Sequence, residues 1–281
     1  MPIIRTVFFT AAFLTASAQA ASSSGEFPEP LAPVVIEGAD IDLSAYFVSY
    51  EDDFDTIDVS GRRCDTDWIA HTPWNGDFGA AVFADPSRGF PFKTKNSLLR
   101  IEARKDKATK TWMSGLLSAR NTCDEGYAQK YGYFEIRARL PEGDGFWPSF
   151  WLNGVDRSRY TAEIDVFEYH SIRPFRMTAT QHVHPRAEGV EGFRKIEIHE
   201  VEPGLLHREF NTYGVSIEED ETVFYLNRKE FFRGKTREEY KQPMYMLLNL
   251  AMAPEDITVD TPKRAFMFVD YVRAYSRKPV E

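Results

Sequence analysis

Short segments in which apolar and polar residues alternate limit the fold of this chain more than any other feature. In residues 133–140 every second residue is apolar, and the intervening residues are Tyr133, Glu135, Arg137 and Arg139. A period of two is typical of a half-buried β-strand, because successive side chains of a strand point to opposite faces. This segment therefore predicts a strand with one face in the core.

Similar strand-like segments recur along the chain, and Gly, Pro, Asn and Asp separate them. The segments are 98–103, 146–152, 177–183, 213–217, 222–226, 245–251 and 265–275. Helical periodicity is scarce from Glu37 onward, apart from one helical turn expected at 236–240. Many short strands with few helices favour an all-β fold, an antiparallel sandwich or barrel.

The first 20 residues have the three regions of a secretory signal peptide. Arg5 supplies the basic start, residues 6–14 form a short apolar run, and Ala18-Gln19-Ala20 supplies the cleavage site. A buried N-terminal helix is the alternative. Residues 21–36 begin as a small, polar and proline-rich stretch, which predicts a flexible tether, with an ordered edge segment as the alternative. We expect one domain over 37–281 and a secreted or periplasmic protein.

The overall charge limits the classes of binding partner that the chain can have. Lys and Arg number 34 against 43 Asp and Glu, so the formal net charge is -9. Nucleic acid is disfavoured, because clustered cations supply most of the affinity for phosphate. No uninterrupted apolar stretch is long enough to span a bilayer. We expect a monomer.

The two cysteines are Cys64 and Cys123. In the oxidising compartment that export implies, a disulfide is the natural pairing. Two unrelated thiols remain the alternative, and without a CxxC spacing the pair gives no support for a zinc site.

One segment, 161–170, contains three carboxylates. Glu163 and Asp165 fall on one face of a regular strand, whereas Glu168 falls on the opposite, apolar face. A β-bulge at 166–167 would absorb one residue and return Glu168 to the acidic face. The alternative to a functional site is an acidic strand face that is simply exposed to solvent. Crowded carboxylates repel one another, however, unless the site exploits a shifted pKa.

The preceding strand adds aromatic residues. Trp147, Ser149 and Trp151 share one face. Aromatic rings beside carboxylates suit a sugar ring whose acetal carbon is attacked. For either tryptophan alone, core packing is the alternative.

The segment Glu163-Ile164-Asp165-Val166-Phe167-Glu168 resembles the signature E-[ILV]-D-x(1,2)-E of glycoside hydrolase family 16. The two-residue spacer is similar to that of the bulged branch, which includes laminarinases, agarases and carrageenases. Further resemblance follows in the same order along the chain, at 47–55, 131–141, 145–152, 210–215, 248–251 and 269–273.

This resemblance implies a β-jelly-roll sandwich with a substrate cleft on its concave face, and hydrolysis with retention of configuration. It implies that Glu163 is the nucleophile and Glu168 the general acid/base, with Asp165 between them. It also implies a histidine near the acid/base, which is His182, although His184 shares its strand face.

Other positions resemble the pattern of glycoside hydrolase family 16 less well. The segment after Asn249 reads Leu-Ala-Met-Ala-Pro, where many relatives have a glycine pair. Asn75 is a candidate for substrate contacts. The resemblance implies no cofactor for catalysis, but it allows a structural calcium at Asp270; a capping or turn-bonding aspartate is the alternative.

These features favour a polysaccharide substrate, with β-1,3- or mixed β-1,3/1,4-glucan as the leading candidate. Four arginines near the motif allow instead an acidic exopolysaccharide or a marine galactan: Arg157, Arg159, Arg173 and Arg176. A lectin-like binding domain is the non-catalytic alternative, and transglycosylation cannot be separated from hydrolysis by sequence.

Overall fold

The computed structural model describes residues 27, 39–74 and 76–279. The expected signal peptide lies outside the described residues, as do Asn75 and all of the expected tether except Phe27. Phe27 packs edge-to-face on Phe268, with ring centroids 5.9 Å apart.

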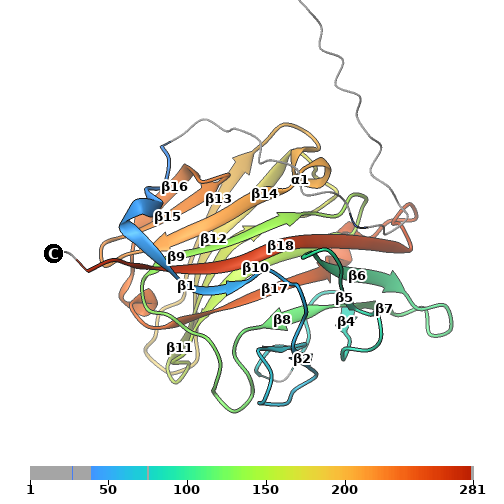
Figure 1. Cartoon of the computed structure of the whole chain (residues 1–281), viewed down its shortest axis with the longest axis horizontal. Coiled ribbons are helices and arrows are strands. Elements are labelled where there is room, and N and C mark those ends of the chain that lie inside the picture. Colours follow the sequence, from blue (N-terminus) through green and yellow to red (C-terminus); the bar gives the residue numbers. More distant parts are fainter. Residues whose placement is uncertain (1–26, 28–38, 75, 280–281) are drawn as a thin grey trace, which may run out of the picture.

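Two β-sheets form the framework of the described chain (Figure 1). The first sheet has the strand order β16-β15-β14-β9-β18-β6-β7-β4, and β1 and β5 pair with β18 and β6. Its strands are β1 (Tyr46–Asp52), β4 (Ala81–Phe83), β5 (Phe92–Thr94), β6 (Leu99–Lys105), β7 (Trp112–Ser114), β9 (Gly132–Arg139), β14 (Asn211–Ile217), β15 (Glu221–Leu226), β16 (Lys229–Lys235) and β18 (Arg264–Arg277).

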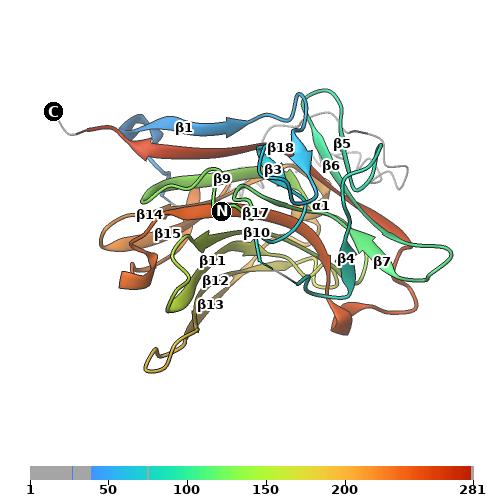
Figure 2. The ribbon, with the colours of Figure 1, turned by 90° about the horizontal axis from the view of Figure 1, so that it is seen from below.

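The second sheet has the order β13-β12-β11-β10-β17-β8-β3-β2. Its strands are β2 (Val59–Ser60), β3 (Trp68–Ile69), β8 (Leu116–Ser118), β10 (Phe146–Gly154), β11 (Tyr160–Glu168), β12 (Arg176–Pro185), β13 (Phe193–Glu200) and β17 (Met244–Met252). Figure 2 shows the two sheets as stacked layers, with β1, β18 and β9 in one and β10–β13 in the other.

The all-β sandwich expected from the alternating segments is confirmed, with one refinement. The strands pair antiparallel except at two places, where β2 runs parallel to β3 and β4 parallel to β7. Both parallel pairs lie at the end of a sheet. The segments that form them are two or three residues long, too short to show the alternating pattern from which antiparallel strands were expected.

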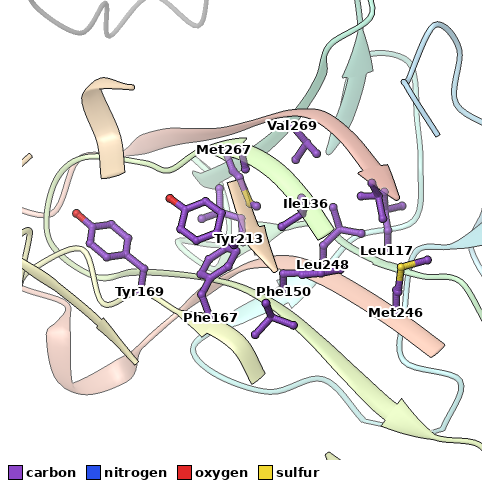
Figure 3. Packing of buried hydrophobic residues seen from close by; sticks show 14 of the residues in the cluster. Leu117, Ile136, Phe150, Phe167, Tyr169, Tyr213, Met246, Leu248, Met267 and Val269 are labelled. Atoms are coloured by element: carbon purple, nitrogen blue, oxygen red, sulfur yellow. The ribbon is translucent and has the colours of Figure 1, made fainter. Parts of the chain in front are cut away.

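The main core fills the space between the sheets. Figure 3 shows Phe150, Phe167 and Leu248 of the second sheet against Ile136 and Tyr213 of the first. These side chains are fully buried, and burial of each large apolar side chain stabilises the fold by about 1.5–3 kcal/mol. Strand β11, which carries the three carboxylates, is therefore anchored by its inner face.

Strand β9 is not half-buried, contrary to the expectation from its alternation. The carboxylate of Glu135 is fully buried on the face predicted to be polar. Arg228 donates two hydrogen bonds to it, at 2.9 and 2.8 Å, and the hydroxyls of Tyr133 and Tyr271 donate two more. Because these donors satisfy the carboxylate, the polar face tolerates burial.

Helices are few in the described part of the chain. The turn expected at 236–240 is the 3-10 helix η2 (Glu238–Tyr240), and a short helix α1 (Leu205–Arg208) was not expected. No helix within residues 39–74 and 76–279 has the length and apolar character needed to cross a membrane.

The expected disulfide between Cys64 and Cys123 is confirmed, with Cα atoms 6.0 Å apart. The bridge joins positions separated by 59 residues. It ties the loop after β2 to the loop after β8, at the end of the second sheet that is remote from β11.

Removal of this bridge tests its contribution to stability. The double variant Cys64→Ser/Cys123→Ser should lose about 4 kcal/mol of unfolding free energy. Without the bridge the unfolded chain has more conformational entropy, which for a loop of this length lowers its free energy by that amount. Urea unfolding measures the loss. Reductant should lower the midpoint of the wild type to that of the variant and leave the variant unchanged; equal midpoints without reductant would contradict the prediction.

Candidate active site

A β-bulge interrupts β11 at the position expected from the sequence. On the β10 side, Phe167 pairs with Phe150 and Asp165 pairs with Trp151, so Val166 has no partner there. On the β12 side the register also shifts between Asp165 and Glu168. The predicted bulge at 166–167 is thus confirmed.

The bulge places two consecutive side chains in the core. Val166 and Phe167 are both buried there, and the Phe167 ring lies 4.3 Å from that of Tyr213. The next residue, Glu168, consequently returns to the outer face of the sheet, the face that carries Glu163. The motif then presents its carboxylates on one side.

Glu163 is half-buried, and its two carboxylate oxygens have different partners. The Asn153 amide donates to Oε2 at 3.3 Å, from the position directly opposite on β10. His184 Nε2 lies 3.2 Å from Oε1. The hydrogen bond to Glu163 raises the pKa of His184, and a protonated His184 stabilises the Glu163 carboxylate.

Glu168 accepts hydrogen bonds from two neutral donors. Trp147 Nε1 lies 3.2 Å from Oε1, and the Thr180 hydroxyl lies 3.2 Å from Oε2. Burial raises the pKa of Glu168, and the charge of Glu163 raises it further, against the lowering effects of His170 and the two donors. The protonated form of Glu168 therefore persists to higher pH than in an exposed glutamate.

Asp165 lies between the two glutamates and is buried. Burial raises its pKa well above the ordinary value, and the charges of Glu168 and Glu163 add to this effect. His182 Nε2 lies 3.4 Å from Oδ2 of Asp165, and burial lowers the pKa of His182. A protonated Asp165 beside a neutral histidine fits these shifts.

The two candidate histidines have separate partners. Their rings stack at 4.9 Å, yet His182 contacts Asp165 and His184 contacts Glu163. The side chain on β12 that hydrogen-bonds Glu168 is Thr180, not a histidine. The expected histidine contact with the acid/base region thus reaches Asp165.

The two tryptophans lie on the same face, as expected, because both contact the ring of Phe78. Trp147 is half-buried and donates to Glu168, and its contact with a substrate stays a prediction. Trp151 is only 6% exposed, and its Nε1 donates to Asn249. Packing against Phe78 and Trp74 covers Trp151 and leaves little of its ring for a sugar.

Several contributors to the site escaped the sequence reasoning. Asn153 and Thr180 face Glu163 and Asp165 across the strand pairs, which only the register reveals. His170 stacks on Trp147, and Asp256 bonds His170 from the 3-10 helix η3 (Pro254–Asp256). The position of His170, two residues after Glu168, could have indicated that it belongs to the site. No feature of the sequence points to Asp256.

The structural calcium expected at Asp270 stays a prediction, and the structure gives the residue another partner. Arg137 forms an ion pair with its carboxylate, and a calcium site needs six to eight oxygens. Among the described residues, two groups of three side chains have ligand atoms within 4.8 Å of one another, and neither includes Asp270. They are Glu163, His182 and His184, and His170, Glu255 and Asp256.

Comparison with known proteins agrees with this geometry. The family model "Glycosyl hydrolases family 16" matches residues 91–265. The chain belongs to this family. Two curated relatives from Rhizobium meliloti (strain 1021) are each matched over 84% of the chain: the Endo-1,3-1,4-beta-glycanases EglC, 30% identical, and ExsH, 28% identical. The family 16 chain spans 53% of the length of each.

Solved structures of family 16 enzymes share the fold. The structure of SCLam, a non-specific endo-beta-1,3(4)-glucanase, matches with a TM-score of 0.69 and 22% identity. The match covers 86% of this chain and 95% of SCLam. The jelly-roll sandwich expected from the motif resemblance is therefore confirmed.

The raised pKa of Asp165 predicts how a neutral substitution affects stability. The stabilising contribution of a group with a raised folded-state pKa is complete below its unfolded value and is lost as the pH rises towards the folded value. Asp165→Asn should therefore raise the melting temperature at pH 7. This gain should shrink as the pH falls towards 3.8, the ordinary pKa of an aspartate.

Asp256→Asn is the matched control. It also removes a buried carboxylate, but one that pairs with Arg173 and His170, so it should lower the melting temperature. Thermal unfolding followed by circular dichroism between pH 3 and 8 measures both variants. A lower melting temperature for Asp165→Asn across this range would contradict the assigned protonation.

Proposed function

We propose that this chain is an exported, retaining endo-β-glycanase of the bulged branch of family 16, which hydrolyses β-1,3- or mixed β-1,3/1,4-glucan. The observation that carries the proposal is the bulge, which presents Glu163 and Glu168 on one face in different environments. Family membership and the endo-1,3-1,4-beta-glycanase activity for which the two Rhizobium meliloti relatives are named support it.

The reaction would proceed by double displacement. The Glu163 carboxylate attacks the anomeric carbon while Glu168 gives its proton to the departing glycosidic oxygen, which forms a glycosyl-enzyme ester. Glu168, now ionised, takes a proton from water as that water attacks the ester, and Glu163 is released.

The neighbours of the two glutamates support this division of roles. Asn153 and His184 stabilise negative charge on Glu163, as a nucleophile requires. Burial raises the pKa of Glu168 and so favours its protonated form, as a general acid requires, and its donors are neutral. Asp165 separates the two and avoids a third charge by remaining protonated.

Charge-neutral substitutions test the roles. Glu163→Gln and Glu168→Gln should each lower cleavage of laminarin and lichenan by at least about 10³-fold, while calorimetric binding of oligosaccharide changes little. Proton NMR of early products should show the β-anomer first. Unchanged turnover in either variant would remove the assignment; binding without cleavage by the wild type would favour a lectin-like domain.

The arginines near the site motivate a second candidate substrate, an acidic exopolysaccharide. Arg173 pairs with Asp256, Arg157 lies 3.9 Å over the ring of Trp74, and Arg159 is exposed. Arg176 lines a small cavity with Glu168, and its side chain has no hydrogen-bond or ion-pair partner among the described residues. A guanidinium group in this position suits a carboxylate or sulfate.

Arg176→Gln distinguishes the two substrates. If the natural glycan is acidic, the variant should lose about tenfold in kcat/KM on a succinylated or sulfated glucan and retain its rate on laminarin. Reducing-end assays on both polymers measure the ratio. An equal ratio for wild type and variant would leave the neutral glucan as the substrate. Export and a monomeric state stay predictions.

A further inference from the structure

The outer side of Glu168 is supported by residues that the proposed reaction does not use. His170, two residues beyond Glu168, stacks its ring on the indole of Trp147, with centroids 5.5 Å apart and planes inclined by 22°. The same indole donates to Glu168 Oε1. The orientation of Trp147 thus connects His170 to the carboxyl group of Glu168.

His170 is itself held from the opposite side. Its Nδ1 lies 2.5 Å from Oδ2 of Asp256, whose carboxylate is nearly fully buried. Arg173 Nη1 lies 3.3 Å from the other oxygen of Asp256. A buried carboxylate with two partners is a fixed anchor, because any rotation would leave a charged oxygen unpaired.

The anchor comes from the segment that follows β17. Strand β17 ends at Met252, and the 3-10 helix η3 follows with Asp256 as its last residue. The Ala253 amide donates to the Gly145 carbonyl, which fixes this turn beside the start of β10. The residues that follow Asn249 therefore bring Asp256 to the edge of the site.

We propose that His170, oriented by Asp256, is a positioning residue that holds Trp147 and thereby aims the Glu168 carboxyl group at the leaving glycosidic oxygen. The inference rests on the proposed function of Glu168. His170 faces Asp256, Glu255 and Arg173, and it lines a cavity of about 40 Å³ with Glu168 and Arg176.

Substrates with different leaving groups test this role. A sugar leaving group needs a proton from Glu168, whereas a dinitrophenolate leaves without one. His170→Ala should therefore lower kcat/KM on laminarin by at least about tenfold, part of the roughly 10²–10⁴-fold contribution of general acid catalysis. On a dinitrophenyl glycoside of a β-1,3-linked glucose oligomer the change should stay below about twofold. The loss should appear in kcat with KM nearly unchanged.

Two further variants make the test decisive. His170→Phe preserves the ring volume beside Trp147 and replaces His170→Ala in the test if that variant does not fold. The same difference between the two substrates is expected for it. His199→Ala removes a histidine that also stacks on an aromatic ring, Phe231, but on β13, and it should alter neither rate.

The outcomes separate the two levels of the proposal. Equal losses on both substrates, or no loss on either, would overturn the role of His170 and leave Glu168 as the acid/base. Failure of the wild-type protein to cleave either substrate would instead contradict the proposed function itself.

Discussion

The extra residue in β11 is the constraint on which the site depends. The side chains of a strand alternate, so an unbroken strand would direct Glu168 into the core, where an unpaired carboxylate is strongly disfavoured. The bulge places Val166 and Phe167 there instead. The contact between Phe167 and Tyr213 of the facing sheet stabilises this arrangement, so core packing and the direction of Glu168 are set by the same local irregularity.

Crowding of three carboxylates on one face has an electrostatic consequence. They cannot all be ionised at low cost, and the neighbours decide which ones keep protons. Asp165 and Glu168 are desolvated, and burial is the largest cause of the raised pKa of each. Glu163 has an amide donor and a histidine beside it. Environment, rather than residue type, thus distinguishes the two glutamates.

Much of this arrangement could be predicted from the sequence, because it depends on local spacing. The alternation of apolar and polar residues predicted the strands. The odd offset of Glu168 from Glu163 predicted the bulge. Burial of the polar face of β9 could not be predicted, because Arg228, which neutralises Glu135, is distant along the chain. For the same reason, nothing in the sequence indicated that Phe78 and Trp74 would cover Trp151.

Cross-strand register explains why the remaining site residues escaped sequence reasoning. Asn153 and Thr180 reach the carboxylates only because β10 and β12 flank β11 in a particular alignment, and a slip of one residue would turn each to the core. On the far side of β10, Asn249 accepts from Trp151 Nε1 and donates to the Trp147 carbonyl. Since this asparagine is fully buried on β17, it fixes the alignment of the tryptophan-bearing strand on one side while the bulge fixes it on the other. The site is therefore held at both edges of β10, and the geometry of Glu168 follows from the register of three neighbouring strands rather than from the motif alone.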